Sequence, residues 1–355
     1  MQRLIATLIV FLLALPALAG LASPFHEQIG RGEDASFEFR DAELSGELGR
    51  DVTYEIRYTK WTPGEPNGRV IVYNHGLQSH RGWFNEAAGS LADDGYAVYA
   101  FDRIGSGESS DGASVLKKEL AAARGHIDRW RLYIETLARM VEIAGKENPG
   151  AEIAVWGNSY GAKVVTAFLF EHGDTLAQKR VSAAVFTTPG LYSNSKTMPL
   201  AFSKMKLLSA STMDRFPVPM VEENGDNGAG WFIGPGPWFE RIKKDERSMR
   251  DATKRFWFQT RDLDKFINGR TKSADFRVPT FHLMVQGDRL MDNEKMERHI
   301  DKHAPKGIFK YYSGGPGSHH LLFFTEDADL AVEDVKHFLD GKSDRIEGRR
   351  TPEAG

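Results

Sequence analysis

Short apolar runs alternate with longer amphipathic stretches along most of the chain from about residue 35. Six runs of four or five residues are dominated by apolar side chains, and they cover residues 70–73, 97–101, 153–156, 183–186, 281–285 and 308–312. Strands that are buried on both faces read as such runs, and the stretches between them have helical spacing. The pattern therefore predicts a mainly parallel central sheet with helices on both faces. In such sheets, ligands bind beyond the carboxyl ends of the strands.

The alternation stops between about residues 191 and 275, where several prolines and a Gly-rich aromatic stretch at 228–239 replace it. Helical-looking segments such as 247–258 flank that stretch. We interpret 191–275 as a cap inserted over the active edge of the sheet, within one domain that spans residues 20–340. Residues 341–355 are polar, and we expect them to form a flexible tail.

The N-terminal residues have the pattern of an export signal. Arg3 supplies a positive start, residues 4–15 are almost continuously apolar, and Pro16 is followed by small residues suited to cleavage before Gly20. The apolar run is near the lower limit for spanning a bilayer, so an uncleaved anchor is the alternative to a cleaved signal peptide (residues 1–19). We expect an exported protein, periplasmic or secreted, or one held at the membrane by this segment.

Composition narrows the chemistry. The chain has 355 residues and no cysteine, which excludes a disulfide framework, a Cys nucleophile, an iron–sulfur cluster and Cys-ligated zinc. Its 22 Phe, 10 Tyr and 7 Trp can build a sizeable core, which excludes a disordered chain. Lys and Arg number 46 against 49 Asp and Glu, so the net charge of −3 gives no reason to expect nucleic acid as a partner.

A candidate nucleophile lies at the end of the apolar run 153–156. Ser159 is the centre of Gly157-Asn158-Ser159-Tyr160-Gly161, and a helical segment follows it. A serine on a sharp strand-to-helix turn projects its hydroxyl above the sheet, and small residues two positions away on either side allow the turn. The pentapeptide alone is a weak signal, but the strand before it and the helix after it make Ser159 a strong candidate.

A nucleophilic serine needs a base that takes its proton and an acid that orients the base, in the chain order Ser, acid, His for this architecture. Asp288 and Asp292 both follow the penultimate predicted strand. We prefer Asp288, which is nearer to the strand end, and Asp292 is the alternative. His319 and His320 follow the last predicted strand, and we prefer His320 as the base, with His319 packing beside it.

The same chemistry needs backbone N–H donors for the oxyanion that forms during ester attack. One candidate is the amide of Tyr160, directly after the serine. The other is the amide of Leu77, in the loop after the run 70–73. His75 in that loop is expected to shape the backbone and not to exchange protons.

These motifs together resemble the α/β-hydrolase superfamily, and within it the monoacylglycerol lipase and lysophospholipase branch, also described as serine aminopeptidase-like. The matching stretches are 75–84, 102–109, 157–161, 286–293 and 317–321. The resemblance implies an α/β-hydrolase fold, Ser159, Asp288 and His320 as a catalytic triad, and Leu77 and Tyr160 as oxyanion-hole amides. It also implies a mobile cap and no cofactor or metal.

The chain departs from the family's pattern beside the serine. Asn158, Tyr160 and Ala162 stand where the family commonly has His, Met and a second Gly, which leaves the substrate subfamily open. Our hypothesis is a serine hydrolase that cleaves carboxylic esters, with monoacylglycerols or lysophospholipids as the best-fitting substrates. An aminopeptidase or amidase on the same triad is the alternative, for which Glu222-Glu223 or Asp245-Glu246 would bind the amine. A non-catalytic binding module on the same fold is the third hypothesis.

Other patterns favour structural interpretations. His299 and His303 lie four residues apart, as metal ligands can, but no third ligand is evident and we expect a solvated helix face. Asp102 and Arg103 are expected to hold a loop in place. The partner indicated by these patterns is a small, lipid-like ester, with membrane-surface contact expected through the N-terminus or the aromatic residues 228–239. The oligomeric state is left open.

Overall fold

The computed structural model describes residues 32–109, 124–194, 211–212, 214–218, 232–269 and 276–352. The predicted export signal and the first four residues of the Gly-rich aromatic stretch, 228–231, lie outside these ranges. Within them, no helix combines the length and the apolar character needed to cross a bilayer.

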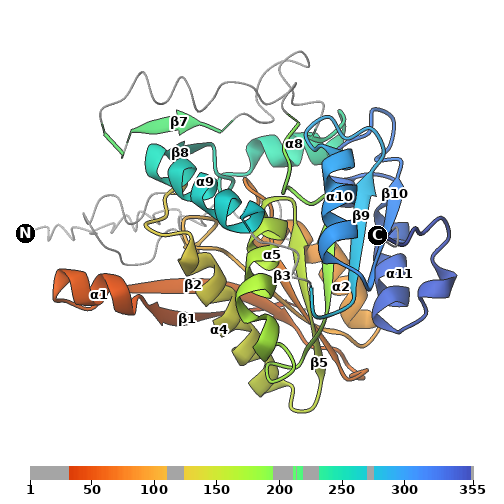
Figure 1. The fold of residues 1–355 in the computed structure, drawn as a ribbon, viewed down its shortest axis with the longest axis horizontal. Helices are drawn as coiled ribbons and strands as arrows, with labels where there is room; N and C mark the ends of the chain where they lie inside the picture. The colour runs from red at the N-terminus through yellow and green to blue at the C-terminus, as the bar shows by residue number, and fades with distance from the viewer. Residues whose placement is uncertain are drawn as a thin grey trace, which may run out of the picture.

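Eight strands form one mixed sheet at the centre of the molecule (Figure 1). In spatial order they are β1 (Gly32–Arg40), β2 (Thr53–Trp61), β4 (Ala97–Phe101), β3 (Arg69–Asn74), β5 (Glu152–Asn158), β6 (Val181–Thr187), β9 (Thr280–Val285) and β10 (Gly307–Tyr312). The six strands from β4 to β10 are parallel to their neighbours. All six predicted strands are confirmed, and with them the mainly parallel sheet.

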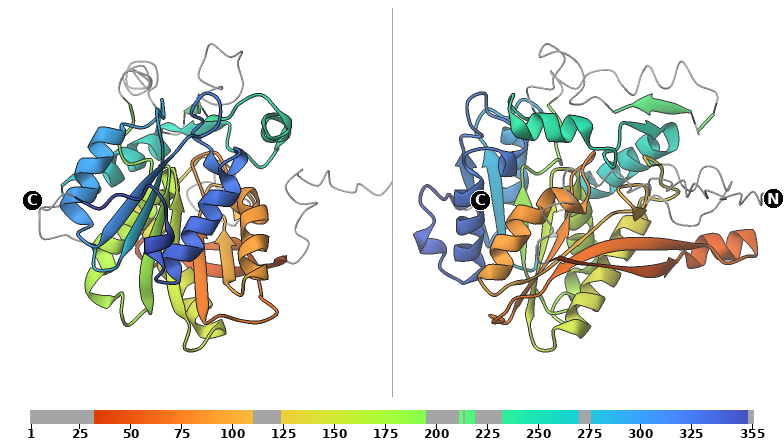
Figure 2. Two further views of the ribbon diagram at one scale, coloured as in Figure 1. Left: turned by 90° about the vertical axis from the view of Figure 1, so that its right-hand side faces the viewer. Right: turned by 180° about the vertical axis from the view of Figure 1, so that it is seen from behind.

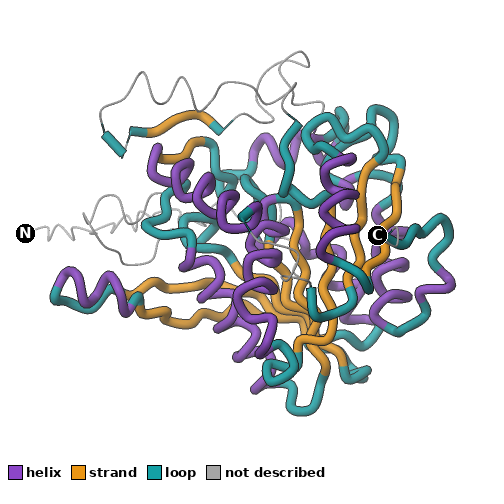
Figure 3. The backbone as a smooth tube through the Cα atoms, viewed as in Figure 1, coloured by secondary structure: helices purple, strands orange, loops and turns teal. Residues whose placement is uncertain are grey.

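Helices cover both faces of the sheet (Figures 2 and 3). The helices are α1 (Ala42–Leu48), α2 (Asn85–Asp93), α4 (Arg131–Glu147), α5 (Tyr160–His172), α8 (Pro237–Lys244), α9 (Lys254–Asn268), α10 (Asn293–His303) and α11 (Ala328–Leu339). Alternate residues of the parallel strands enter two separate cores, one under α4, α5 and α10 and the other under α2 and α11. Burial on both faces explains why the central strands read as continuous apolar runs.

The antiparallel strands β1 and β2 were not predicted by the apolar runs. They pair over their whole length, and β2 also pairs with β4. In β1 only Ala35, Phe37 and Phe39 pack on the core, while Glu33, Asp34 and Glu38 are exposed. A strand with one half-buried face alternates polar and apolar residues, and so gives no continuous apolar run.

The described part of the predicted cap lies beyond the carboxyl ends of the parallel strands, at the top of Figure 1. It contains a two-stranded antiparallel sheet, β7 (Arg215–Pro217) and β8 (Asp251–Thr253), together with helices α8 and α9. Helix α9 packs on α5, the helix that follows Ser159. The exact boundaries 191 and 275 stay a prediction, because residues on either side of the inserted elements lie outside the described ranges.

The C-terminal stretch is packed against the domain, so the expectation of a flexible tail is wrong for residues 341–352. Ile346 is fully buried in the core beneath α11. Arg350 forms an antiparallel bridge with Phe309, with Phe309 N–H to Arg350 C=O at 3.0 Å and the reverse bond at 2.7 Å. One apolar anchor and two backbone hydrogen bonds are enough to hold a polar segment whose composition resembles a tail.

Candidate active site

Ser159 lies on the tight turn between β5 and α5. Its backbone has φ 50° and ψ −112°, an uncommon conformation for a residue other than glycine. The turn is held by backbone hydrogen bonds, because Ser159 N–H donates to Thr187 C=O at 2.9 Å and Gly190 N–H donates to Ser159 C=O at 2.9 Å. Backbone strain of this kind persists only where the surroundings fix it, and it occurs preferentially at functional sites.

The glycines on either side of Ser159 are required by close contacts. A Cβ at Gly157 would lie 2.7 Å from Ala162 Cα, and a Cβ at Gly161 would lie 2.1 Å from the carbonyl oxygen of Asn74. The turn therefore brings the start of α5 against β5 itself and against the end of β3. This contact places the residue after the serine close to the loop that begins at His75.

His320 and Asp288 are brought to Ser159 from the loops after β10 and β9. The His320 Nε2–Ser159 Oγ distance is 2.8 Å, and the His320 Nδ1–Asp288 Oδ2 distance is 2.7 Å. A carboxylate only accepts, so Nδ1–H donates to Asp288 and Nε2 accepts from the serine hydroxyl. His320 is 1% exposed and Asp288 is 6% exposed. The three predicted residues thus form one hydrogen-bonded chain.

Asp292, the alternative acid, is used elsewhere. Its carboxylate caps α10 by accepting from Lys295 N–H at 3.1 Å, and it forms an ion pair with Lys295 Nζ at 2.8 Å. Asp288 has, besides His320, the N–H groups of Leu290 at 2.8 Å and Met291 at 3.3 Å on its second oxygen. These backbone donors fix the carboxylate toward the imidazole.

The cap also contacts the His320 loop. Leu321 N–H donates to Phe232 C=O at 2.8 Å, and the Phe232 ring stands edge-on to the His320 imidazole, with ring centroids 5.9 Å apart. His319 packs beside Gly234, where a Cβ would lie 2.6 Å from its Nε2. His319 therefore faces the cap, as a packing residue, and His320 faces Ser159.

The loop after β3 lies directly against Ser159. A Cβ at Gly76 would be 3.5 Å from Ser159 Cβ. Leu77 follows, half-buried, and Tyr160 is the first residue of α5, whose N–H groups have no acceptor within the helix. No described residue accepts a hydrogen bond from the backbone N–H of Leu77 or of Tyr160. Two free amide donors therefore lie on segments next to the serine.

His75 is a structural residue in this loop. Its Nδ1–H donates to Gly76 C=O at 2.8 Å, and its Nε2 accepts from Arg103 N–H at 3.2 Å, so both ring nitrogens are used by backbone. Burial and the neighbouring Arg103 guanidinium lower the pKa of His75 well below its ordinary value. The imidazole is neutral and has no nitrogen left for proton transfer.

Asp102, at the end of β4, holds two loops together. It accepts from Arg81 N–H at 2.7 Å, from Glu108 N–H at 2.9 Å and from the Arg81 guanidinium. Burial alone would raise the pKa of Asp102, but Arg81 and the surrounding donors hold it at about 2. Arg81 also pairs with Glu108, which in turn pairs with Arg247 of the cap at 2.7 Å.

A second buried histidine–aspartate pair joins the cap to the loop after β3. Asp245 Oδ2 accepts from His80 Nε2 at 2.8 Å and from Trp83 Nε1 at 2.6 Å. His80 Nδ1 accepts from Gly82 N–H at 3.1 Å. Burial alone would raise the pKa of Asp245, but His80 and Trp83 lower it below the ordinary range. Sequence reasoning named Asp245 only as a candidate for binding an amine, and its contact with His80 was not predicted because Asp245 lies in a segment without periodicity.

His299 and His303 do not form the solvated helix face that we expected. They are 3% and 2% exposed, and their rings pack with each other and with Phe170 and Phe276. Burial lowers the pKa of His299 well below its ordinary value, and His303 lowers it further. Among the described residues, no three His, Asp or Glu side chains are arranged to hold a metal ion.

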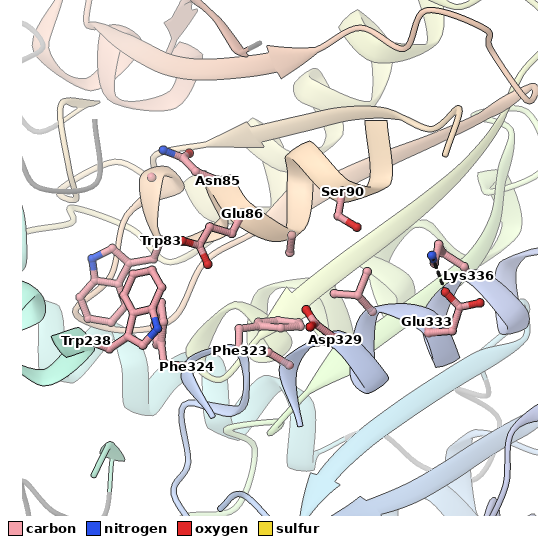
Figure 4. A pocket seen from close by; sticks show the side chains of 14 residues that line it. Trp83, Asn85, Glu86, Ser90, Trp238, Phe323, Phe324, Asp329, Glu333 and Lys336 are labelled. Carbon is pink, nitrogen blue, oxygen red and sulfur yellow. Dashed lines mark ion pairs between the residues drawn. The ribbon is translucent and has the colours of Figure 1, made fainter. Parts of the chain in front are cut away.

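A cavity of about 230 Å³ lies between α2 and α11 (Figure 4). The rings of Trp83, Trp238 and Phe324 close one end. The carboxylates of Glu86 and Asp329 face the space from the two helices, and burial together with Asp329 raises the pKa of Glu86. Ser159, Asp288 and His320 do not line this cavity, so it is separate from the hydrogen-bonded chain that they form.

A mainly parallel sheet that carries a serine on the turn after β5, with His and Asp on the loops after β10 and β9, defines the α/β-hydrolase class of serine hydrolases. The comparison with protein families agrees with this class and narrows it. The sequence pattern of the family described as serine aminopeptidase, S33, matches residues 65–327, and the chain belongs to that family. It is a hydrolase with the lipase and esterase fold.

Individual relatives point in the same direction. The chain is 26% identical over 285 residues to a monoacylglycerol lipase of Mycolicibacterium smegmatis, covering 80% of this chain and 92% of the relative. A soluble variant of monoglyceride lipase from Saccharomyces cerevisiae, solved with a substrate analog, superposes with a TM-score of 0.65 at 19% identity, covering 81% and 92% of the two chains. A Paleococcus ferrophilus monoacylglycerol lipase superposes with a TM-score of 0.61 at 18% identity, covering 81% and 99%. The two structures establish similarity of fold.

Proposed function

We propose that this chain hydrolyses carboxylic esters through an acyl-enzyme on Ser159, with His320 as general base and acid and Asp288 as the residue that orients it. The hydrogen-bonded chain Ser159–His320–Asp288 is the observation that carries the proposal. It joins three loops that are far apart in sequence, and each contact has the direction that nucleophile activation requires.

The reaction runs in two halves. His320 Nε2 takes the proton as Ser159 Oγ attacks the ester carbonyl, and the Leu77 and Tyr160 amides hold the oxyanion of the tetrahedral intermediate. His320 then gives that proton to the departing alcohol, which leaves an acyl group on Ser159. Water, deprotonated by His320, attacks the acyl carbon; the bond to Ser159 Oγ then breaks, His320 returns the proton to that oxygen, and the acid is released. Asp288 keeps Nδ1 protonated in both halves and stabilises the imidazolium.

Monoacylglycerols and lysophospholipids are the substrate classes that we propose. The named activities of the curated relative and of the two structural neighbours support an ester of a single acyl chain. An aminopeptidase would need a free carboxylate near the site for the substrate amine. Asp245, one of the candidates for binding that amine, is buried and accepts hydrogen bonds from His80 and Trp83. Its carboxylate is therefore engaged, which favours an ester substrate over an aminoacyl amide. Glu222-Glu223 lies outside the described residues.

Ser159→Ala tests the reaction. Turnover of p-nitrophenyl esters should fall on the order of 10⁶-fold if the three residues act as a unit, and labelling by a fluorophosphonate probe should disappear. Ser90→Ala, which changes an exposed serine on α2, is the matched control and should behave as the unchanged protein. Esterase activity retained by Ser159→Ala would overturn the mechanism. Failure of the folded, unchanged protein to label would favour a binding module.

A substrate panel separates the ester classes. It contains p-nitrophenyl esters of increasing chain length, a monoacylglycerol, a lysophospholipid and aminoacyl amides. Hydrolysis of the single-chain lipids with little turnover of the amides is the expected result. Faster turnover of aminoacyl amides would favour the aminopeptidase alternative.

Export completes the proposal. The apolar residues 4–15 after Arg3 support an exported protein, and the aromatic residues near α8 support contact with a lipid surface. Fractionation of cells and mass spectrometry of the mature N-terminus distinguish a cleaved signal from an anchor. A protein recovered with the cytosol, with residues 1–19 intact, would contradict export.

A further inference from the structure

Arg103 is a buried cation that has no carboxylate partner among the residues the structure describes. It is 1% exposed, and every hydrogen bond of its guanidinium within the described chain goes to a neutral acceptor. Its neighbour Asp102 is already occupied by Arg81. Buried arginines are normally paired with acids, since an uncompensated charge is costly to bury. A charge kept here without such a partner calls for a functional explanation.

The acceptors of Arg103 all belong to the three residues before Leu77. Nη1 donates to Asn74 Oδ1 at 2.9 Å and to the His75 carbonyl, and Nη2 donates to the Gly76 carbonyl at 2.8 Å. The Arg103 backbone N–H adds a bond to His75 Nε2 at 3.2 Å. One side chain therefore fixes the whole path of the loop from the end of β3 to Leu77.

The bond to Gly76 acts on the peptide group that the proposed oxyanion hole uses. The carbonyl of Gly76 and the N–H of Leu77 belong to the same trans peptide unit, so the two point in opposite directions. A guanidinium on the carbonyl sets the plane of that unit and turns the N–H away from Arg103. It also polarises the amide, which makes the N–H a stronger donor. His75 Nδ1–H, at 2.8 Å, binds the same carbonyl.

Arg103 also contacts the second oxyanion donor. Its guanidinium carbon lies 5.1 Å from the ring centroid of Tyr160 and 5.7 Å from that of Tyr133. The Tyr160 phenol is tied in turn to Thr260 of α9, at 3.0 Å. Arg103 thus contacts both segments that carry the proposed oxyanion-hole amides.

We propose that Arg103 is the positioning residue of the oxyanion hole, which holds and polarises the Gly76–Leu77 peptide and fixes its spacing from Tyr160. The inference rests on the proposed ester hydrolysis at Ser159. Because the oxyanion exists only after attack, the contribution of Arg103 should be realised in the transition state and should affect kcat more than KM.

Arg103→Met and Arg103→Lys test the role, with Arg180→Met as the matched control. Like Arg103, Arg180 donates to backbone carbonyls, in its case those of Gly145, Asn148 and Ala151, but it does so at the opposite end of the sheet. Removing one oxyanion donor costs about 10²- to 10³-fold in kcat. Loosening one should cost on the order of 10- to 100-fold for Arg103→Met, with KM within about threefold. Arg103→Lys keeps the charge but reaches fewer carbonyls, and it should lie between Arg103→Met and the unchanged enzyme.

A transition-state analogue separates positioning from folding. The inhibition constant of phenylboronic acid, whose serine adduct is tetrahedral and anionic, should weaken in parallel with kcat for both Arg103 variants. Arg180→Met should lower the thermal midpoint and leave kcat and boronate affinity unchanged. If Arg103→Met does not fold, Arg103→Lys decides the outcome.

The outcomes are distinct. Unchanged kcat in folded Arg103 variants, or a fall in kcat without loss of boronate affinity, would overturn the positioning role while Ser159 chemistry stands. An unchanged protein that fails to react with the fluorophosphonate probe overturns the proposed hydrolysis, and the role of Arg103 with it.

Discussion

Two of the buried histidine–aspartate pairs in the described part of the chain lie in different regions of the molecule. His320 with Asp288 joins two loops of the sheet, and His80 with Asp245 joins the sheet to the cap. Both imidazoles are 1% exposed, and their distances to the carboxylate are 2.7 and 2.8 Å. By burial and by contact with an acid, the two pairs are alike.

The second ring nitrogen distinguishes them. In His320 the carboxylate binds Nδ1, and Nε2 faces the Ser159 hydroxyl. In His80 the carboxylate of Asp245 binds Nε2, and Nδ1 accepts a hydrogen bond from the N–H of Gly82 in the same loop. A histidine–aspartate contact therefore becomes a reacting unit only where the remaining nitrogen meets a group that can give up a proton. The same contact elsewhere holds two segments together.

Asp288→Asn gives the largest expected effect on this comparison. An amide cannot replace the carboxylate that keeps His320 Nδ1 protonated, so kcat for an ester should fall on the order of 10⁴-fold. Asp292→Asn, four residues away, changes the carboxylate that caps α10 and should leave kcat nearly unchanged. Steady-state kinetics of the two variants checks the assignment. Equal losses in both would show that Asp288 is not the orienting acid.

Asp245→Asn should act on stability instead of rate. His80 Nε2 and Trp83 Nε1 both donate to Asp245 Oδ2, and Arg247 N–H donates to Oδ1, so the NH₂ of an amide would face either that N–H or the two buried donors. We expect a loss of about 3 kcal/mol in the free energy of unfolding, measured in urea, and less than about tenfold in kcat. Trp83→Phe removes one donor and should cost less. A fall in kcat like that of Asp288→Asn would break the distinction between the two pairs.

No acid among the described residues contacts His282, whose Nε2 lies 3.0 Å from Thr280 Oγ1. His282 is fully buried beside Phe186, and burial lowers its pKa to about 3. Since protonation is then favoured in the unfolded chain, the stability that the neutral ring contributes is present above pH 6.5 and is lost as the pH falls toward 3. At pH 5, His282 should therefore lower the free energy of unfolding by about 2 kcal/mol relative to its value above pH 6.5.

His282→Leu removes that titration. The difference between urea midpoints at pH 8 and pH 5 should shrink relative to the unchanged protein. His337→Leu, on a half-exposed histidine of α11, is the control and should leave the difference unchanged. An identical pH dependence in His282→Leu would mean that the buried imidazole does not set acid stability.

Tyr160→Phe gives the smallest expected effect, at another contact between the site and the cap. The phenol–Thr260 hydrogen bond of 3.0 Å is lost, which should cost about 1 kcal/mol of unfolding free energy. The backbone amide of residue 160 stays in place, so kcat should change by less than about threefold. A double-mutant cycle with Thr260→Val checks whether the two side chains are coupled. Additive losses would mean that this contact does not attach the cap.

The sheet could be predicted from the sequence because its central strands are buried on both faces and are bounded by Gly and Asp. That Ser159, Asp288 and His320 lie together could also be predicted, because each follows the end of a parallel strand and these ends meet at one edge of the sheet. Asp245 with His80 could not be predicted, because the two are far apart in sequence and share no pattern. The burial of His299 was hidden by charged neighbours on the same helix, while its packing partners Phe170 and Phe276 come from other elements.

The bridge between Phe309 and Arg350 has a consequence for self-association. Strand β10 ends the sheet on one side, and an edge strand with free N–H and C=O groups is a template for pairing with another chain. Residues 346–350 occupy part of that edge and anchor themselves through the Ile346 side chain. A chain shortened after Leu339 would expose both the apolar core residues that Ile346 covers and an open strand edge. Such a chain should aggregate on storage, as light scattering would detect, even where its active site is intact.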